Sequence, residues 1–110
     1  MSDTTWEEDS GLLSLILLAK FYQLPADPIS LGHEFKIPGE NMGVDDILRA
    51  SKKIGLKAKA LTYEPETVLS LPLPAIAKHK DNHFIILAKK ENKGFLIHDP
   101  LARKQFFFLA

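Results

Sequence analysis

Apolar residues occupy nearly every position from residue 11 to residue 22, and leucine is the commonest of them. The run is too long for a typical strand and leaves no polar face, so it predicts a buried central helix. The acidic residues 7–9 precede it, where the positive end of a helix dipole favours negative charge. Leu24-Pro25 ends this helix, and a short helix is expected over residues 29–35.

Residues 44–54 carry apolar side chains at every third or fourth position, which is the period of an amphipathic helix with one buried face. Two aspartates in the first turn and two lysines in the last turn complement the helix dipole. Gly55 follows, and glycine readily adopts the left-handed backbone that ends many helices. The pattern therefore predicts a helix over residues 44–54 with Gly55 as its C-terminal cap.

The hydrophobic period shortens in the second half of the chain. Residues 56–60 alternate between apolar and basic, as a half-exposed strand does, and residues 65–71 are expected to form a short helix. Further strands are predicted over residues 74–78, 83–90, 94–98 and 104–108. Turn-forming residues separate these strands, which favours an antiparallel meander. The order indicates the α+β class, with N-terminal helices packed on a C-terminal antiparallel sheet.

The composition is that of one soluble globular domain of 110 residues, with 45% hydrophobic and 25% charged residues. Its 14 basic and 14 acidic residues give a net charge of zero, which argues against a nucleic-acid-binding protein. The absence of cysteine excludes disulfides, thiolate metal sites and a cysteine nucleophile. His79, His83 and His98 match no familiar zinc spacing, so no metal is predicted.

The two ends of the chain bear on where the protein works. The acidic N-terminus lacks the basic and apolar stretches of a signal peptide. No apolar run approaches the roughly 20 residues of a membrane-spanning helix, so we expect a soluble domain. Residues 106–110 are strongly apolar, and we expect residues 1–110 to be a single domain excised from a longer protein.

Three polar residues are candidates for catalysis. His83 opens one predicted strand and Asp99 closes another, so a hairpin would bring the imidazole and the carboxylate together at one sheet edge. Polar residues are also common at strand ends without any function. Ser10 lies at the start of the buried helix, where the dipole assists a nucleophile. Serine is equally a favoured N-cap residue, and taken alone Ser10 is predicted to be a cap.

Five short motifs together carry a family resemblance. They are Asp9-Ser10-Gly11 before the apolar helix, Gly55-Leu56-Lys57-Ala58 after a Gly-led helix, Leu73-Pro74-Ala75-Ile76, His83-Phe84 opening an apolar strand, and Asp99-Pro100 after a strand. Over about residues 6–105, the chain resembles cysteine peptidase family thirty-nine, the papain-like domain at the N-terminus of bacterial ABC exporters that process bacteriocins. It resembles more closely the inactive version of this domain in type I secretion exporters of RTX toxins and adhesins.

The resemblance implies a papain-like cysteine peptidase fold and a role for four positions. His83 matches the catalytic base, Asp99 the acid that orients it, and Ser10 the position of the cysteine nucleophile. Thr4 falls where the family has the glutamine of its oxyanion hole. A serine hydroxyl is far less acidic than a thiol, and loss of one oxyanion donor costs about 10²–10³ in rate. We therefore expect a degenerate, catalytically inactive peptidase domain.

The same resemblance implies an ATP-driven transporter as the parent protein, with this domain on the cytoplasmic side of the bacterial inner membrane. The domain would hold an unfolded RTX-type protein or adhesin for export. Its other partners would be the transmembrane and nucleotide-binding domains of the same exporter, and it would need no cofactor. Candidate substrate contacts are Trp6, Tyr22, Tyr63, His83 and Phe84, since large aromatic side chains often carry interface energy.

Two alternatives stay open at this point. The first is a serine-variant leader peptidase that uses Ser10, His83 and Asp99 as a triad. The second is a purely structural module that docks on the transporter.

Overall fold

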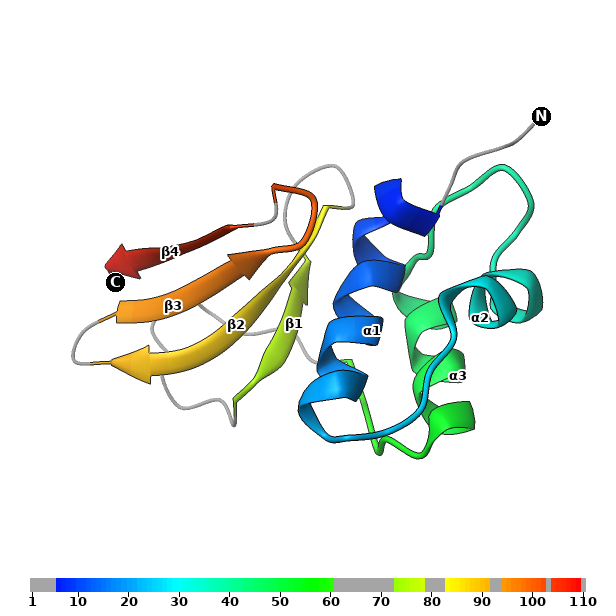
Figure 1. Cartoon of the computed structure of the whole chain (residues 1–110), viewed down its shortest axis with the longest axis horizontal. Helices are drawn as coiled ribbons and strands as arrows, with labels where there is room; N and C mark the ends of the chain where they lie inside the picture. Colours follow the sequence, from blue (N-terminus) through cyan, green and yellow to red (C-terminus); the bar gives the residue numbers. More distant parts are fainter. Residues whose placement is uncertain (1–5, 61–72, 79–82, 92–93, 103, 110) are drawn as a thin grey trace.

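The computed structural model describes residues 6–60, 73–78, 83–91, 94–102 and 104–109. Within them, helices come first and strands follow (Figure 1). The helical elements are the 3₁₀ helix η1 (Trp6–Glu8), α1 (Ser10–Phe21), α2 (Pro28–Phe35) and α3 (Val44–Ile54). The strands are β1 (Ala75–Lys78), β2 (Phe84–Glu91), β3 (Gly94–Asp99) and β4 (Lys104–Leu109). The predicted α+β class is therefore confirmed.

The strands form one antiparallel sheet in the order β1-β2-β3-β4, so each strand pairs with its neighbour in the chain. Ala75 of β1 lies opposite Leu87 of β2, and Ile86 of β2 lies opposite His98 of β3. A register shift between Leu87 and Lys89 interrupts the pairing of β2 with β3. The predicted meander is confirmed.

The three predicted helices in the first half of the chain are all present. α3 has the predicted bounds, and α1 and α2 begin one residue earlier than expected. Gly55 adopts a φ of 100°, as the predicted left-handed cap requires, and its N–H bonds to the carbonyls of Ser51 and Lys52. No helix in the described ranges combines the length and the apolarity needed to cross a lipid bilayer.

The strand predicted over residues 56–60 is wrong, because these residues form irregular backbone. Leu56 packs against the hydrophobic core, whereas residues 57–60 are exposed. The alternation of apolar and basic residues therefore corresponds to only one side chain packed on the core. Within the described ranges, no strand pairs with residues 56–60. The helix expected over residues 65–71 lies outside the described residues.

The hydrophobic core is built around α1, which lies between the sheet on one side and α2 and α3 on the other (Figure 1). Its main cluster consists of Leu12, Leu15, Ile16, Leu31, Met42, Ile47, Ala50 and Phe84. A smaller cluster of Leu87, Phe95 and Ile97 belongs to the sheet. Because α1 packs against both layers, it has no fully polar face, in agreement with its sequence pattern.

Candidate functional site

His83 and Asp99 lie at neighbouring strand ends, as the predicted hairpin requires. His83 immediately precedes β2, and Asp99 is the last residue of the antiparallel strand β3. Nε2 of His83 lies 3.2 Å from both carboxylate oxygens of Asp99, and both side chains are partly exposed. The expected imidazole–carboxylate pair is confirmed. Because Nε2 faces the carboxylate, Nδ1 is the ring nitrogen left to exchange a proton with another group.

The turn after β3 holds Asp99 in position. The backbone N–H groups of Leu101 and Ala102 donate to its Oδ1 at 3.0 and 3.2 Å. Partial burial acts to raise the pKa of Asp99, but these two N–H groups and the charge of His83 outweigh it, so the pKa lies below its usual value. Asp99 is therefore ionised at neutral pH and is a fixed acceptor for the histidine ring.

Ser10 is the first residue of α1, and its hydroxyl is buried. The backbone N–H of Phe84 donates to Oγ of Ser10 at 2.9 Å, and Ser10 is only 4% exposed. The cap predicted at Ser10 is wrong, because Asp9 is the N-cap and its carboxylate accepts the N–H of Leu12 at 3.2 Å. Ser10 instead joins the start of α1 to the start of β2.

The Ser10–Phe84 bond places the nucleophile position next to the histidine–carboxylate pair, since Phe84 directly follows His83. The three positions that the resemblance assigned to a triad therefore converge from α1, β2 and β3. Among the described residues, however, the Ser10 hydroxyl bonds to a backbone amide and makes no hydrogen bond to the His83 ring. A hydroxyl attacks only with a base to take its proton, and the arrangement lacks that contact.

Asp9 is a buried carboxylate that the sequence pattern identified only as favourable helix-dipole charge. Its Oδ2 accepts the N–H of Met42 at 3.0 Å and lies 3.5 Å from the ammonium of Lys36. A buried charge is costly unless it is paired and hydrogen-bonded, and these contacts meet that need. Asp9 thus joins the start of α1 to the segment between α2 and α3. An aspartate just before an apolar helix is itself a cap signal, so the sequence could have identified this role.

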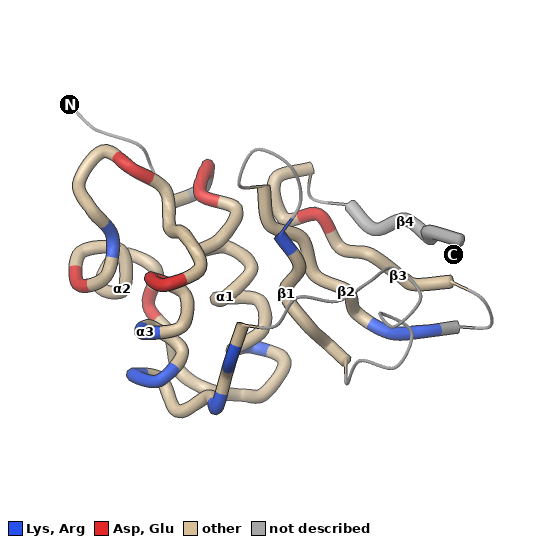
Figure 2. The backbone as a smooth tube through the Cα atoms, turned by 180° about the vertical axis from the view of Figure 1, so that it is seen from behind, with Lys and Arg blue, Asp and Glu red and all other residues tan. Residues whose placement is uncertain are grey.

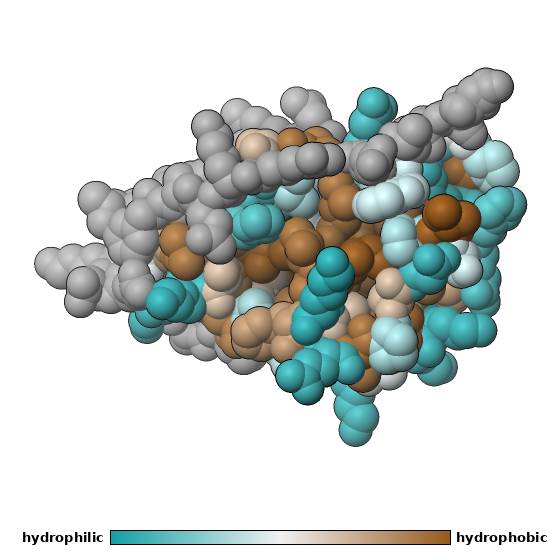
Figure 3. Space-filling model, in the orientation of Figure 1, coloured by the Kyte–Doolittle hydropathy of each residue, from teal (hydrophilic) through white to brown (hydrophobic). Residues whose placement is uncertain are grey.

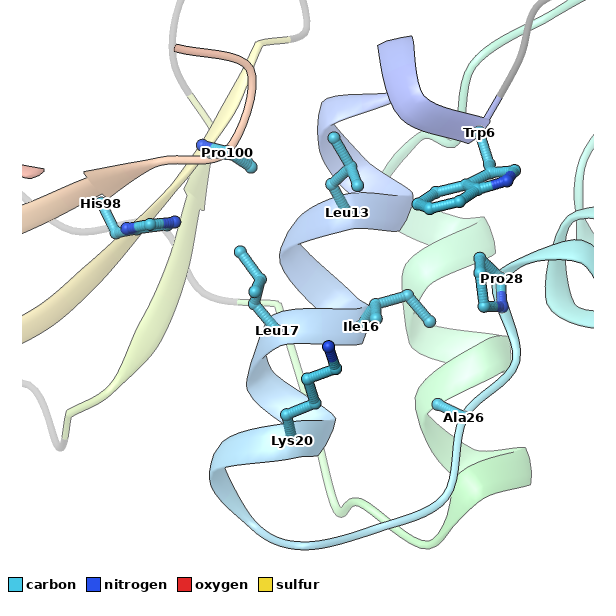
Figure 4. Close-up of a pocket in the computed structure, with 9 residues that line it drawn as sticks. All are labelled: Trp6, Leu13, Ile16, Leu17, Lys20, Ala26, Pro28, His98 and Pro100. Carbon is cyan, nitrogen blue, oxygen red and sulfur yellow. The ribbon is translucent and has the colours of Figure 1, made fainter. Parts of the chain in front are cut away.

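An open groove of about 370 Å³ lies between α1 and the end of β3 (Figure 4). It is lined by Trp6, Leu13, Ile16, Leu17, Lys20, Ala26, Pro28, His98 and Pro100. The lining is mostly apolar, and hydrophobic side chains gather between α1 and the sheet in the space-filling view (Figure 3). His98 and Pro100 flank Asp99 in the chain, but Ser10, His83 and Asp99 do not themselves line the groove. Such a concave apolar surface with a few polar groups is typical of binding sites.

The aromatic residues singled out in the sequence occupy different places. Trp6 lines the groove, and Tyr22 is 47% exposed at the end of α1, outside the groove lining. Phe84, another candidate substrate contact, belongs to the main core and is 3% exposed. Tyr63 and Thr4 lie outside the described residues.

Sequence reasoning found only Trp6 among the groove residues. The lining comes from η1, α1, the segment before α2 and the end of β3, and no local motif links these segments. Within the described ranges, no group of three or more His, Asp or Glu side chains is placed to hold a metal ion. His79, one of the three histidines considered for a metal, lies outside them.

The sequence matches a known protein family along nearly its whole length. Residues 2–108 match the model of the Peptidase C39 family. A solved structure, the N-terminal peptidase C39-like domain of the toxin secretion ATP-binding protein from Vibrio parahaemolyticus, superposes with a TM-score of 0.75. The two are 24% identical, and the match covers 99% of this chain and 85% of the other. The fold is therefore that of a C39-like peptidase domain.

Two curated relatives are similar over most of the chain. The Toxin RTX-I translocation ATP-binding protein of Actinobacillus pleuropneumoniae is 34% identical over 95 residues, and the Cyclolysin secretion/processing ATP-binding protein CyaB of Bordetella pertussis is 37% identical over 95 residues. Each match covers 84% of this chain and 13% of the relative. The chain thus spans about one eighth of the length of the curated relatives that it matches.

Proposed function

Because the chain belongs to the peptidase C39 family, we propose that it is a non-catalytic domain of a type I secretion ABC exporter that holds an unfolded secreted polypeptide for export. The polypeptide would be an RTX-type protein or an adhesin. The domain would lie on the cytoplasmic side of the bacterial inner membrane. Its further partners would be the transmembrane and nucleotide-binding domains of the same protein. The similarity to translocation ATP-binding proteins supports this placement.

The open apolar groove between α1 and β3 is the single observation that carries the holding role. An unfolded chain exposes apolar side chains, and a groove with leucine, isoleucine and tryptophan walls can bury them. The groove wall includes His98 and Pro100, the chain neighbours of Asp99.

The state of Ser10 supports a domain that does not cut what it holds. Its hydroxyl is buried and accepts a hydrogen bond from the Phe84 amide, so it stabilises the contact between α1 and β2. Attack by this oxygen would require it to leave that bond and to reach a base. The position of the family's oxyanion-hole glutamine is occupied by Thr4, which is a shorter side chain.

A binding experiment on the groove tests the proposal. The chain is mixed with an RTX-type polypeptide kept unfolded, and capture and cleavage are followed by pull-down and mass spectrometry. We expect capture without cleavage. Leu17→Ser, in the groove wall, should weaken capture by about tenfold or more, because apolar anchors dominate such interfaces. Leu18→Ser is the matched control, since Leu18 is the next residue of α1, is partly exposed and does not line the groove.

If the Leu17 and Leu18 variants capture the polypeptide equally, the groove is not the binding site. Circular dichroism of both variants excludes a loss of fold as the cause of any difference.

The preserved His83–Asp99 pair favours one other function, a serine-variant leader peptidase. Cleavage of the polypeptide that disappears in Ser10→Ala and in His83→Gln would overturn the non-catalytic proposal. Ser10→Cys should not create efficient cleavage either, because a thiol alone leaves the oxyanion position without its glutamine. Efficient turnover by Ser10→Cys would show that only the nucleophile is missing.

A further inference from the structure

The helical layer separates the charges of this neutral chain. α1 and α3 pack side by side and run in the same direction (Figure 1). Their starts lie together, because the Asp9 carboxylate accepts the N–H of Met42 just before α3. Their ends therefore lie together at the opposite side of the layer. Because the helices have 12 and 11 residues and rise about 1.5 Å per residue, the side of the layer with the helix starts lies about 16–18 Å from the side with the helix ends.

Acidic residues mark the starts of these helices and basic residues mark their ends. Asp45 and Asp46 lie in the first turn of α3, and Asp9 is the N-cap of α1. The backbone view shows most acidic positions of the helical layer toward the helix starts and most lysines toward the helix ends, Lys36 beside Asp9 being an exception (Figure 2). We call the following exposed residues the basic end: Lys20, Phe21, Tyr22, Lys52, Lys53, Lys57 and Lys59.

Two exposed aromatic side chains accompany the lysines of the basic end. Phe21 is 64% exposed, and its ring meets the ring of Tyr22 edge to face with centroids 5.1 Å apart. Both extend from the last turn of α1, directly after Lys20. Exposed rings among cationic side chains can enter the polar–apolar boundary of a lipid layer while the ammonium groups stay with the headgroups.

The composition of the basic end distinguishes a lipid surface from a protein partner. Its cations are all lysines, and lysine is depleted in protein–protein interfaces, where arginine is enriched. Arg49 of α3 lies outside it and bonds the Asp46 carboxylate at 2.6 Å. Lysine is a flexible point charge that suits the diffuse negative field of headgroups. Lys53 lies 3.6 Å from Glu34, but both are half exposed, and such surface pairs are weak.

We propose that the basic end docks on a membrane surface of anionic phospholipid, with the ends of α1 and α3 toward the headgroups. This rests on the proposed function in one respect: a domain of a membrane exporter has such a surface beside it. The acidic helix starts then point away from the membrane, so the separated charges orient the domain as well as attract it.

Flotation with lipid vesicles tests the docking. The 110-residue chain is mixed with vesicles of phosphatidylcholine, or of phosphatidylcholine with phosphatidylglycerol. We expect binding only to the vesicles with phosphatidylglycerol, and a loss of binding as salt rises, because salt screens exposed charges. Equal binding to both vesicle types, or no binding to either, overturns the proposal.

Two charge-reversal variants locate the contact. Lys57→Glu/Lys59→Glu lies in exposed irregular backbone away from the core and should weaken vesicle binding by about tenfold or more. Lys89→Glu/Lys90→Glu changes the net charge equally at exposed positions on β2, in the sheet. We expect a clearly smaller loss from this control. Equal losses would mean that net charge alone drives binding, and the basic end would not be the docking surface.

Tryptophan fluorescence can measure which side of the domain faces the membrane, because the chain contains a single tryptophan. Trp6 lies before α1, and Tyr22 lies directly after it. Headgroup spin labels should quench the emission of a Tyr22→Trp/Trp6→Phe variant and leave that of Trp6 in the unchanged chain nearly constant. Stronger quenching of Trp6 would reverse the proposed orientation.

Capture of the unfolded polypeptide separates this proposal from the proposed function. Lys57→Glu/Lys59→Glu leaves every groove residue intact and should capture the polypeptide as the unchanged chain does. If vesicle binding fails while capture holds, only the docking surface is wrong. If capture fails while vesicle binding holds, only the holding role is wrong. A polypeptide that competes with vesicles for the basic end would overturn the choice of lipid as its partner.

Discussion

Two buried serines one helical turn apart on α1 have opposite effects on stability. Oγ of Ser10 accepts the Phe84 N–H and so satisfies a buried backbone donor. Oγ of Ser14 is fully buried and has no hydrogen-bond partner among the described residues. A buried hydroxyl without a partner costs free energy, whereas one that satisfies an amide prevents a larger loss.

Alanine at each serine tests this difference. Ser10→Ala should lower the free energy of unfolding by about 1–3 kcal/mol, because the Phe84 N–H is left buried without an acceptor. Ser14→Ala should leave it unchanged or raise it, because it removes an unpaired polar atom. Urea denaturation of the two variants gives the comparison. Equal destabilisation by both would contradict these roles of the two hydroxyls.

The lowered pKa of Asp99 predicts a stability change in acid. Burial raises this pKa. The Ala102 N–H, the charge of His83 and the Leu101 N–H together lower it by more. A carboxyl whose folded pKa lies below its unfolded value of about 3.9 stabilises the fold at higher pH, and that contribution is lost as pH falls through the folded pKa. The stability advantage of the unchanged chain over Asp99→Asn should therefore shrink below about pH 4.

Urea midpoints at pH 7 and pH 3 measure this advantage. Asp27 also has a lowered pKa, chiefly because the Ser30 N–H donates to it, but it is common to both proteins and cancels in the difference. A difference in midpoint that is the same at both pH values would show that Asp99 makes no such contribution.

At the scale of elements, the start of α1 is packed so closely that a side chain at position 11 would be crowded on three sides. A Cβ there would meet the Met42 carbonyl oxygen and the Ile47 side chain at 3.1 Å, and the Phe84 ring at 3.2 Å. Helix α3, its leading segment and strand β2 therefore all approach α1 at this one point. The close approach also explains how a hydroxyl at Ser10 can reach the β2 backbone.

Two glycine-to-alanine changes in helices should have opposite signs. Gly11→Ala should destabilise the chain by about 1–3 kcal/mol, because the Met42 carbonyl is backbone and cannot move aside cheaply. Gly32→Ala in α2 should stabilise it by up to about 1 kcal/mol, since the new methyl meets ordinary contacts at 3.6 Å and alanine favours helix. Thermal unfolding of both variants decides the point, and a stabilised Gly11 variant would contradict this packing.

The elements that sequence predicted well are those whose signals are local. The apolar period, the charged turns and Gly55 define α3 from residues within the helix itself, and its bounds match. The strand expected over residues 56–60 failed because a strand also needs a partner, which alternation cannot supply. The cap at Ser10 failed by one residue, since serine and aspartate both cap helices and only their contacts distinguish them.

At the scale of the whole molecule, function depends on how the layers meet. The His83–Asp99 pair follows from antiparallel pairing of neighbouring strands, so the sequence could place it. The groove needs η1, α1 and β3 together, and the basic end needs two helices that run in the same direction. Neither can be obtained from periodicity, because each depends on which elements pack side by side.

The sequence by itself determined the helices, the meander, the histidine–carboxylate pair and the presence of serine where the resembling peptidases have cysteine. These depend on residue type and on short spacings, which the chain order fixes. Only the tertiary structure decided what that serine does. Its hydroxyl bonds to an amide 74 positions away, and that distance is closed by the packing of α1 on the sheet. The same packing leaves an open groove between α1 and the end of β3.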